Sequence, residues 1–269
     1  LIGITLAYLG FGVWALVGAV LSQSTLTAGL AFLFSRHEFG WRHQKNQRVH
    51  FFKFGARYSL IGFIEFLSGS LDAMIIGKIF GSAAAGIYGR ASLLANLPVQ
   101  QPANIVTRAL FPVISRLGAH RQIASLQISV LVLGSYALAI SWGMIAAAPD
   151  IVWVLLGDKW LDAVPVLQIL ALAIAPQYIA HLMGVTLDAM GALKAKLRIQ
   201  AGVLMLQLVA FSLLLSYGVP GIAGAMVLAE WTRCLLMAGL ILRLLRPPLH
   251  EFRLILSVVL LSGLCSFGM

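Results

Sequence analysis

IASLQISVLVLGSYALAISWGMIAAA, residues 123–148, decides what kind of protein this chain is. The stretch holds no charged side chain, and it exceeds the roughly 20 apolar residues with which a helix crosses about 30 Å of hydrocarbon. Comparable apolar stretches cover most of the remaining chain: 12–34, 54–80, 86–115, 163–191, 199–217 and 221–245, with a last one at 254–269. The sequence therefore predicts an all-α polytopic membrane protein.

The linkers between these stretches alternate in charge, and this alternation orients the chain. The linkers after every second crossing carry basic residues: Arg36, Arg42, Lys45, Arg48 and Lys53; then Arg116 and Arg121; then Lys194, Lys196 and Arg198; then Arg243, Arg246 and Arg253. The intervening linkers hold Asp150, Asp158 and Asp162 against a lone Lys159. By the positive-inside rule, the basic linkers are predicted to be cytoplasmic and the others to face outward.

The composition agrees with a membrane protein and excludes other classes. Hydrophobic residues make up 60% of the chain and charged residues 10%, whereas a soluble domain carries about 25% charge. The net charge of +10 sits in short linkers, where it sets topology and meets anionic membrane lipid, and it forms no basic face for nucleic acid. Cys234 and Cys265 lie in apolar stretches as small core residues. We therefore expect no metal, no cofactor and no nucleic-acid partner.

The stretches group into four segments. Residues 1–34 are expected to end an N-terminal transmembrane lobe, and 35–53 to form a basic cytoplasmic linker between lobes. Residues 54–245 are expected to form a C-terminal six-helix lobe, and 246–269 a cytoplasmic loop with the start of an additional helix. The outer loop at 149–162 is expected to hold a short interfacial helix anchored by Trp153 and Trp160. The chain begins without Met and stops within an apolar stretch, so we expect a fragment truncated at both ends.

Ionisable groups inside a membrane are costly and are candidates for function. In the 54–80 stretch, small and polar residues step by three and four positions, which places them on one helix face. They are Gly55, Tyr58, Gly62, Glu65, Gly69 and Asp72. Glycines at this spacing are more often explained by close helix packing than by a cavity wall, whereas Glu65 and Asp72, with Arg90 of the next stretch, are harder to explain structurally.

The 86–115 stretch carries a second polar face, formed by Arg90, Gln101, Asn104 and Arg108. Pro98 and Pro102 lie in its middle, and they predict a kink or an opening of the helix. Arg108 lies toward the cytoplasmic end, so snorkelling to the interface is an alternative explanation for that arginine.

Two later stretches add further polar groups. In 163–191, a third stripe contains Gln177, His181, Gly184 and Asp188, and in 221–245 Glu230 and Arg233 are separated by three residues. Each has a structural explanation as well: an interhelical hydrogen bond for His181, snorkelling for Asp188, and a local ion pair for Glu230 with Arg233.

Together the four sets of polar residues, in 54–80, 86–115, 163–191 and 221–245, suggest a hydrated, charged cavity inside one lobe. Asp72 and Arg90 lie on consecutive helices of a tight hairpin, so an ion pair between them, facing a wet cavity, is a reasonable expectation. Arginines in such a cavity suit a pyrophosphate group, because their fork of N–H donors matches its oxygens.

Three short motifs then occur in order. They are D-x-x-I-I-G at 72–77, G-x-Y-x-x-A at 86–91 and F-P-x-x-S-R at 111–116, and LLGDKW follows at 155–160. With this spacing the chain resembles the polysaccharide-exporting branch of the multidrug/oligosaccharidyl-lipid/polysaccharide flippase superfamily, the Wzx-type translocases, and in particular their colanic-acid-exporter (WzxC-like) subgroup. The similarity extends over nearly the whole chain.

This resemblance implies a bacterial inner-membrane, multi-pass protein of two lobes. It implies that undecaprenyl-pyrophosphate-linked oligosaccharide is moved across the membrane by alternating access, driven by an ion gradient and without enzymatic catalysis. Lipid-linked oligosaccharide, membrane lipids and the polysaccharide polymerase and export machinery are the implied partners. On this basis the candidate substrate-binding residues are Arg90, Arg108, Gln101, Asn104 and Arg233, and the candidate ion-coupling or ion-pairing residues are Glu65, Asp72, Asp188, Glu230 and His181.

Other functions compete with this hypothesis. A drug or metabolite exporter of the same superfamily would have an apolar, aromatic cavity with few arginines, and a lipid II flippase is a similar rival. A membrane enzyme acting on lipid-linked glycans would need a large outer loop with catalytic Arg or His, and residues 149–162 contain neither. A purely structural membrane anchor would have no use for four polar stripes.

Overall fold

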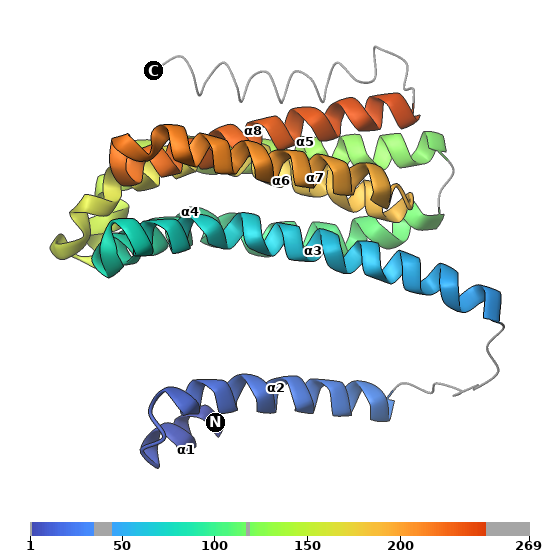
Figure 1. Ribbon diagram of the computed structural model, residues 1–269. Coiled ribbons are helices and arrows are strands. Elements are labelled where there is room, and N and C mark those ends of the chain that lie inside the picture. Colours follow the sequence, from blue (N-terminus) through green and yellow to red (C-terminus); the bar gives the residue numbers. More distant parts are fainter. Residues whose placement is uncertain (1, 35–44, 117–118, 246–269) are drawn as a thin grey trace. The chain divides into compact units, whose positions relative to one another are not determined.

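The computed structural model describes residues 2–34, 45–116 and 119–245 (Figure 1). The chain divides into two compact units, Leu1–Phe51 and Phe52–Met269. In the first unit a short helix, α1 (Ile2–Tyr8), packs against α2 (Val13–Phe34). Positive φ angles at Gly10 and Gly12 make the turn between them, because glycine takes this conformation without steric cost.

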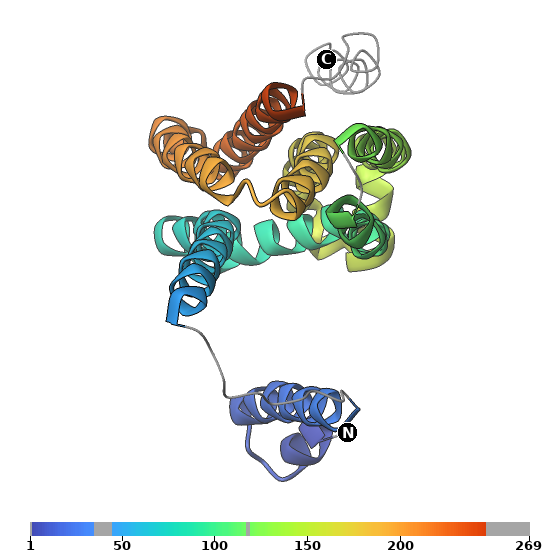
Figure 2. The same ribbon diagram turned by 90° about the vertical axis from the view of Figure 1, so that its right-hand side faces the viewer.

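The second unit contains the helices that position the candidate site. They are α3 (Lys45–Ile79, which begins ahead of the unit boundary), α4 (Gly81–Arg116), α5 (Ala119–Leu156), α6 (Val164–Ala189), α7 (Leu193–Leu214) and α8 (Gly218–Leu245). Two 3-10 turns, η1 (Asp158–Ala163) and η2 (Leu215–Tyr217), join neighbouring helices. The axes run roughly side by side, as the view along them shows (Figure 2).

Helix α6 is the centre of this unit. It packs against α4, α5 and α8, and apolar residues are buried on several of its faces, including Leu167, Ile174 and Leu182. A helix that is apolar all round is one that lies inside a bundle. Helix α7 packs mainly on α8. The apolar core is therefore formed largely by α4, α5, α6 and α8.

The described residues confirm the fold class predicted from the sequence, an all-α, multi-pass membrane protein. Five segments are long and apolar enough to cross a membrane: 17–34, 55–79, 124–156, 158–189 and 193–244, the last covering both α7 and α8. Helix α4 is not among them. Its 36 residues include three prolines and the polar series from Arg90 to Arg108, which make it less apolar than its neighbours.

Several helix limits differ from the sequence-based expectation. Helix α3 begins at Lys45, inside the segment expected to be linker, and α7 begins at Leu193 rather than 199. Helix α5 continues through Pro149 to Leu156 and contains Trp153, so the expected interfacial helix is only the short turn η1 with Trp160. In each case the charged or proline residues taken as loop signals lie within a helix instead.

The prolines of α4 do not break the helix, which runs continuously past Pro98, Pro102 and Pro112. Pro102 has no N–H to donate to the carbonyl of Pro98, four residues earlier. The Tyr136 hydroxyl of α5 donates a hydrogen bond to that carbonyl at 3.0 Å. A neighbouring helix therefore satisfies the freed backbone group, as membrane proteins require.

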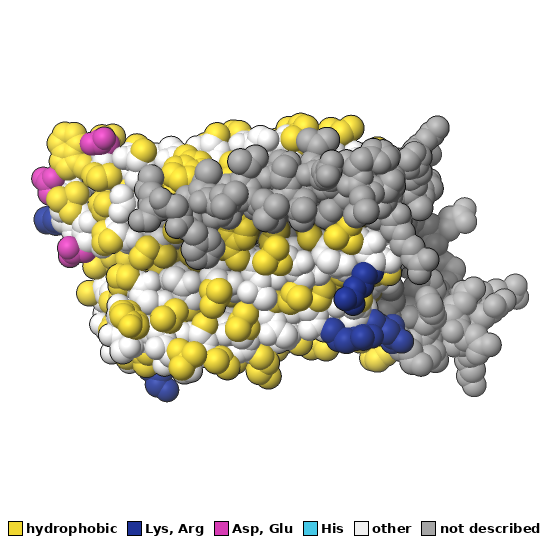
Figure 3. All heavy atoms as spheres, turned by 90° about the horizontal axis from the view of Figure 1, so that it is seen from above, with side chains coloured by type: hydrophobic (Ala, Val, Ile, Leu, Met, Phe, Trp, Pro, Cys, Tyr) yellow, Lys and Arg dark blue, Asp and Glu magenta, His cyan; other side chains and the backbone are white. Residues whose placement is uncertain are grey.

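Charged groups gather at the two ends of the second unit. Asp150, Asp158, Lys159 and Asp162 lie where α5 meets α6, and the opposite end holds the Lys194, Arg198 and Arg243 of α7 and α8. Figure 3 shows the acidic side chains of this face at one end, together with a few basic ones, a group of basic side chains near the other end, and a largely hydrophobic and uncharged surface between. Some of the predicted features lie outside the described residues: the helix at 254–269, and residues Arg36, Arg42, Arg246, Arg253 and Cys265. The same holds for the side chains of Lys45, Arg48, Lys53, Arg116 and Arg121.

Candidate functional site

A cavity of about 350 Å³ lies within the second unit, between α3, α4, α6, α7 and α8. It is lined by Tyr58, Glu65, Thr107, Gln177, Tyr178, Ala180, His181, Gly184, Val185, Asp188, Lys196, Gln200, Arg233 and Met237. Charged and amide side chains form much of this lining, although all the surrounding helices except α4 belong to segments that are apolar enough to cross a membrane. Such a cavity is a candidate binding site.

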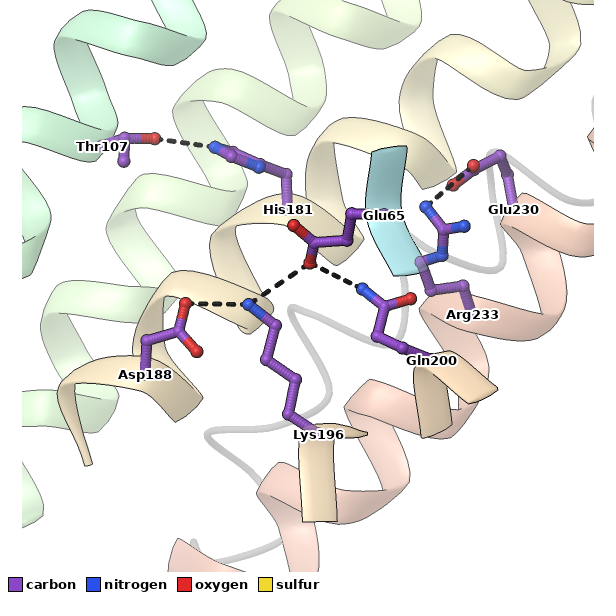
Figure 4. Close-up of polar contacts among 8 residues, drawn as sticks. All are labelled: Glu65, Thr107, His181, Asp188, Lys196, Gln200, Glu230 and Arg233. Atoms are coloured by element: carbon purple, nitrogen blue, oxygen red, sulfur yellow. Dashed lines mark hydrogen bonds and ion pairs between the residues drawn. The ribbon is translucent and has the colours of Figure 1, made fainter. Parts of the chain in front are cut away.

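Lys196 is the central charge of the site (Figure 4). Its side-chain ammonium lies 2.8 Å from Asp188 Oδ2 and 3.5 Å from Glu65 Oε1, and the residue is 5% exposed. Gln200 donates a hydrogen bond to the same Glu65 oxygen at 2.8 Å. These four residues, here called the Lys196 cluster, join α3, α6 and α7.

The position of Lys196 follows from the face that α7 buries. Residues at spacings of three and four line that face: Leu193, Lys196, Gln200, Val203, Gln207 and Ala210. Gly184 of α6 leaves room opposite, since a Cβ at this position would lie 3.4 Å from both Cε and Nζ of Lys196. The Lys196 side chain therefore passes close to the backbone of α6 at Gly184, and its ammonium reaches Asp188 of the same helix.

Burial makes this charge expensive, because removing an ion from water costs several kcal/mol even after relaxation. Two carboxylates offset that cost, and together they leave one surplus negative charge when both are ionised. Glu65 exposes 43% of its side chain, so a group bound in the cavity can contact the Glu65 member of the Lys196–Glu65 ion pair directly. Among the described residues, the buried oxygens Asp188 Oδ1 and Gln200 Oε1 have no hydrogen-bond partner, and both can interact with a bound group.

Two further polar pairs lie beside the cluster. His181 Nε2 is 3.0 Å from the Thr107 hydroxyl, which connects α6 to α4. Arg233 and Glu230 of α8 form an ion pair at 3.0 Å, as expected from their spacing. The Nε of Arg233 and the Oε2 of Glu230 are buried and have no hydrogen-bond partner in the part of the chain that the structure describes. Arg233 lines the cavity and can therefore face an anion together with Lys196.

Asp72 and Arg90 do not form the expected ion pair. The Tyr88 hydroxyl donates a hydrogen bond to Asp72 Oδ2, and the guanidinium of Arg90 lies 5.7 Å from the centre of the Trp160 ring. The reason is helical phase: Tyr88 and Arg90 are two residues apart, about 200° around the helix. When α4 turns Tyr88 toward α3, Arg90 points elsewhere and makes a cation–π contact.

The predicted site residues therefore separate into two groups. Glu65, His181, Asp188 and Arg233 line the cavity, and Glu230 lies next to it through Arg233. The cavity lining does not include Asp72, Arg90, Gln101, Asn104 or Arg108. The last three are exposed on α4.

The sequence-based reasoning missed Lys196 and Gln200. Lys196 was assigned to a basic cytoplasmic linker together with Lys194 and Arg198, although only Lys196 is buried. A signal was available, because Lys196, Gln200 and Gln207 recur at helical spacing with Val203 and Ala210. In the described parts of the chain, no group of three His, Cys, Asp or Glu is placed to hold a metal ion.

A model of the polysaccharide biosynthesis protein family matches residues 1–165. The chain belongs to this family. The match includes α3 and α4 with the D-x-x-I-I-G, G-x-Y-x-x-A and F-P-x-x-S-R motifs, and it ends before Asp188 and Lys196. The resemblance to the Wzx-type polysaccharide exporters is confirmed.

Individual relatives have names from polysaccharide biosynthesis. The chain is 29% identical over 160 residues to the teichuronic acid biosynthesis protein TuaB of Bacillus subtilis, which covers 58% of this chain and 33% of TuaB. It is 30% identical over 177 residues to the succinoglycan biosynthesis transport protein ExoT of Rhizobium meliloti, covering 64% and 35%.

A third relative is the lipopolysaccharide biosynthesis protein WzxC of Escherichia coli, 28% identical over 120 residues, which are 44% of this chain and 24% of WzxC. The matched regions thus span about a third or less of the length of these relatives. No solved structure matches the chain.

Proposed function

We propose that the protein carrying this chain moves undecaprenyl-pyrophosphate-linked oligosaccharide across the bacterial inner membrane, by alternating access between two lobes, for surface polysaccharide or lipopolysaccharide biosynthesis. One observation carries the proposal: a buried lysine is held between two carboxylates, in a cavity lined mainly by helices that are long and apolar enough to cross a membrane. Family membership and the relatives' names in polysaccharide biosynthesis and transport support it.

The size of the cavity indicates which part of the substrate it binds. Small-ligand sites have volumes of about 300–1,000 Å³, and about 350 Å³ lies at the lower end of that range. This volume suits the pyrophosphate and its adjoining sugar, with the rest of the oligosaccharide outside. The ammonium of Lys196 and the free Nε of Arg233 supply charged N–H donors to phosphate oxygens, and the polyprenyl tail stays in lipid.

The carboxylates supply a coupling mechanism. Lys196 is held by Asp188 and Glu65. A proton or Na⁺ on either carboxylate weakens its hold on Lys196, which is then free to bind the anionic head. Loss of that cation restores the ion pairs and favours release. Substrate and cation thus shift the inward–outward equilibrium through their different affinities for its two states.

The remaining predicted residues keep proposed roles outside this cavity. Arg90 and Arg108, with Gln101 and Asn104, offer phosphate or sugar contacts along the exposed face of α4, and Asp72 remains a candidate ion-coupling residue. A charged lining disfavours one alternative, a small-molecule exporter of the same superfamily. The other alternative, a lipid II flippase, would also bind a polyprenyl-linked pyrophosphate, so the relatives' names in polysaccharide biosynthesis, and not the lining, favour the proposed substrate over it. The polysaccharide polymerase and export machinery are the proposed partners.

Complementation of a flippase-null, capsule-forming strain tests the proposal. We expect restored surface polysaccharide and removal of the stalled lipid-linked oligosaccharide. Lys196→Ala should abolish both effects, and Lys196→Arg should keep part of the activity. Lys194→Ala is the matched control, because Lys194 is an exposed lysine in the same turn of α7. Efflux of small drugs with no effect on lipid-linked intermediates would favour the small-molecule exporter instead.

A further inference from the structure

A second cavity, separate from the Lys196 cluster, lies between α7 and α8. Its volume is about 320 Å³, and it is lined by Ala195, Arg198, Ile199, Leu235, Leu236, Gly239, Leu240 and Arg243. Six of these eight side chains are uncharged and small or aliphatic, and the two arginines are the only charges. We call this cavity the α7/α8 groove.

The two arginines lie at the same end of the unit. Arg198 is in the second turn of α7 and Arg243 is in the last turn of α8, and both are exposed. Within the described residues neither arginine forms an ion pair, unlike Arg233 and Lys196 of the same helices. As far as the described residues go, the groove therefore carries two positive charges that no acidic side chain offsets, at the end of the helices that the basic linkers predict to be cytoplasmic.

The wall of the groove is open and apolar. Leu235 is 54% exposed and Leu236 is 46% exposed, and both lie on a helix within a membrane-spanning segment. Gly239 deepens the groove, because a Cβ at this position would meet no atom within 4 Å. An aliphatic chain can therefore lie along α8 and below the two guanidinium groups.

We propose that the α7/α8 groove binds an anionic phospholipid of the cytoplasmic leaflet, with the phosphate between Arg198 and Arg243 and one acyl chain along Leu235, Leu236 and Leu240. Guanidinium groups match phosphate oxygens in charge and in donor geometry. Basic pockets between transmembrane helices on the cytoplasmic side are suited to anionic headgroups. A soluble phosphate would leave the apolar wall unused, so a lipid accounts for both halves of the groove.

The experiment measures lipid retention rather than transport. The purified protein is equilibrated in mixed micelles of phosphatidylglycerol and phosphatidylethanolamine, and the bound lipid is counted by native mass spectrometry. We expect the wild type to retain phosphatidylglycerol preferentially. Arg198→Ala with Arg243→Ala should reduce this preference about tenfold or more, because each basic residue near an anionic surface contributes roughly 1 kcal/mol. Lys194→Ala should not change it, since Lys194 is exposed but does not line the groove.

A steric variant tests the acyl-chain half. Gly239→Leu fills the groove and should lower retention of both lipids, whereas Gly202→Leu should not, because Gly202 of α7 has equally open space but lies outside the groove. Unchanged phosphatidylglycerol preference in the double arginine variant would overturn the proposal. Displacement of phosphatidylglycerol by inorganic phosphate, or by equimolar undecaprenyl phosphate, would also overturn it, assigning the groove to a soluble anion or to a polyprenyl lipid.

Discussion

Lys196 is the residue that depends most on its neighbours, because its buried charge must be neutralised by them. Its ammonium is buried, and its charge is matched by groups from two other helices, Asp188 of α6 and Glu65 of α3. Breaking a buried ion pair by removing one partner is costly because it leaves the other charge uncompensated. The free energy of unfolding should therefore depend more on the balance of these charges than on any single one of them.

A double-mutant cycle tests this balance. We expect Lys196→Ala to lower the free energy of unfolding by about 3–5 kcal/mol. Asp188→Asn added to it should recover part of that loss, because one uncompensated carboxylate is removed. Thermal unfolding in detergent provides the measurement. Strictly additive effects of the two substitutions would contradict the coupling inferred from the 2.8 Å contact.

At the scale of the helix, the sequence predicted well which parts of the chain form helices. The expected stretches 12–34 and 163–191 agree closely with α2 (Val13–Phe34) and α6 (Val164–Ala189), because an apolar run of membrane length has few alternatives. The start of α7 was missed because Lys194, Lys196 and Arg198 indicated a loop. The partners that neutralise Lys196 come from α3 and α6, and such distant contacts are not visible in a local pattern.

The same limit applies to the candidate site. Helical spacing correctly grouped His181 with Asp188, and Glu230 with Arg233, because each group lies on one helix. It failed for Asp72 and Arg90, because their pairing depends on the rotation of α4 against α3. The rotation is set by the buried Tyr88, and the sequence alone gave no reason to prefer Tyr88 over Arg90.

The proline-containing part of α4 gives a prediction at the same scale. Tyr136→Phe removes the hydroxyl that satisfies the Pro98 carbonyl. Because this hydrogen bond is exposed, we expect the free energy of unfolding to fall by only about 0.5–1.5 kcal/mol. Tyr217→Phe is the control, since Tyr217 is 70% exposed and no hydrogen bond is recorded for its hydroxyl among the described residues. Equal unfolding temperatures for the two variants would contradict this role of Tyr136.

The start of α8 gives another. A Cβ on Gly221 would lie 2.2 Å from the carbonyl oxygen of Leu214, so Gly221→Ala forces α8 away from the end of α7. We expect a loss of about 1–3 kcal/mol, typical of overpacking. Gly224→Ala, on the same helix with open space around it, should have little effect. Denaturation of both variants in the same detergent measures the difference.

At the scale of the whole molecule, the distribution of charge predicts the orientation in the membrane. The end with Lys194, Arg198 and Arg243 should be cytoplasmic, and the end with Asp158 and Lys159 should face outward. In a background without Cys234 and Cys265, we expect Lys159→Cys to react with an impermeant maleimide on intact spheroplasts. Lys194→Cys should react only after the membrane is opened. The reverse labelling pattern would show that the end with Lys194 faces outward, which contradicts the predicted topology.

The attachment of α3 has a consequence for how this lobe can move. Toward its middle, α3 is joined to α7 by polar groups: Glu65 contacts Lys196 and Gln200, and the Ser68 carbonyl accepts a hydrogen bond from Gln207 at 2.9 Å. Further along, Ile76 is fully buried in the apolar core. Water can replace a hydrogen bond at small net cost, but it cannot replace apolar packing. When water enters the cavity, we therefore expect the contacts of Glu65 to break first. Helix α3 would then rotate about its apolar end near Ile76, which stays packed.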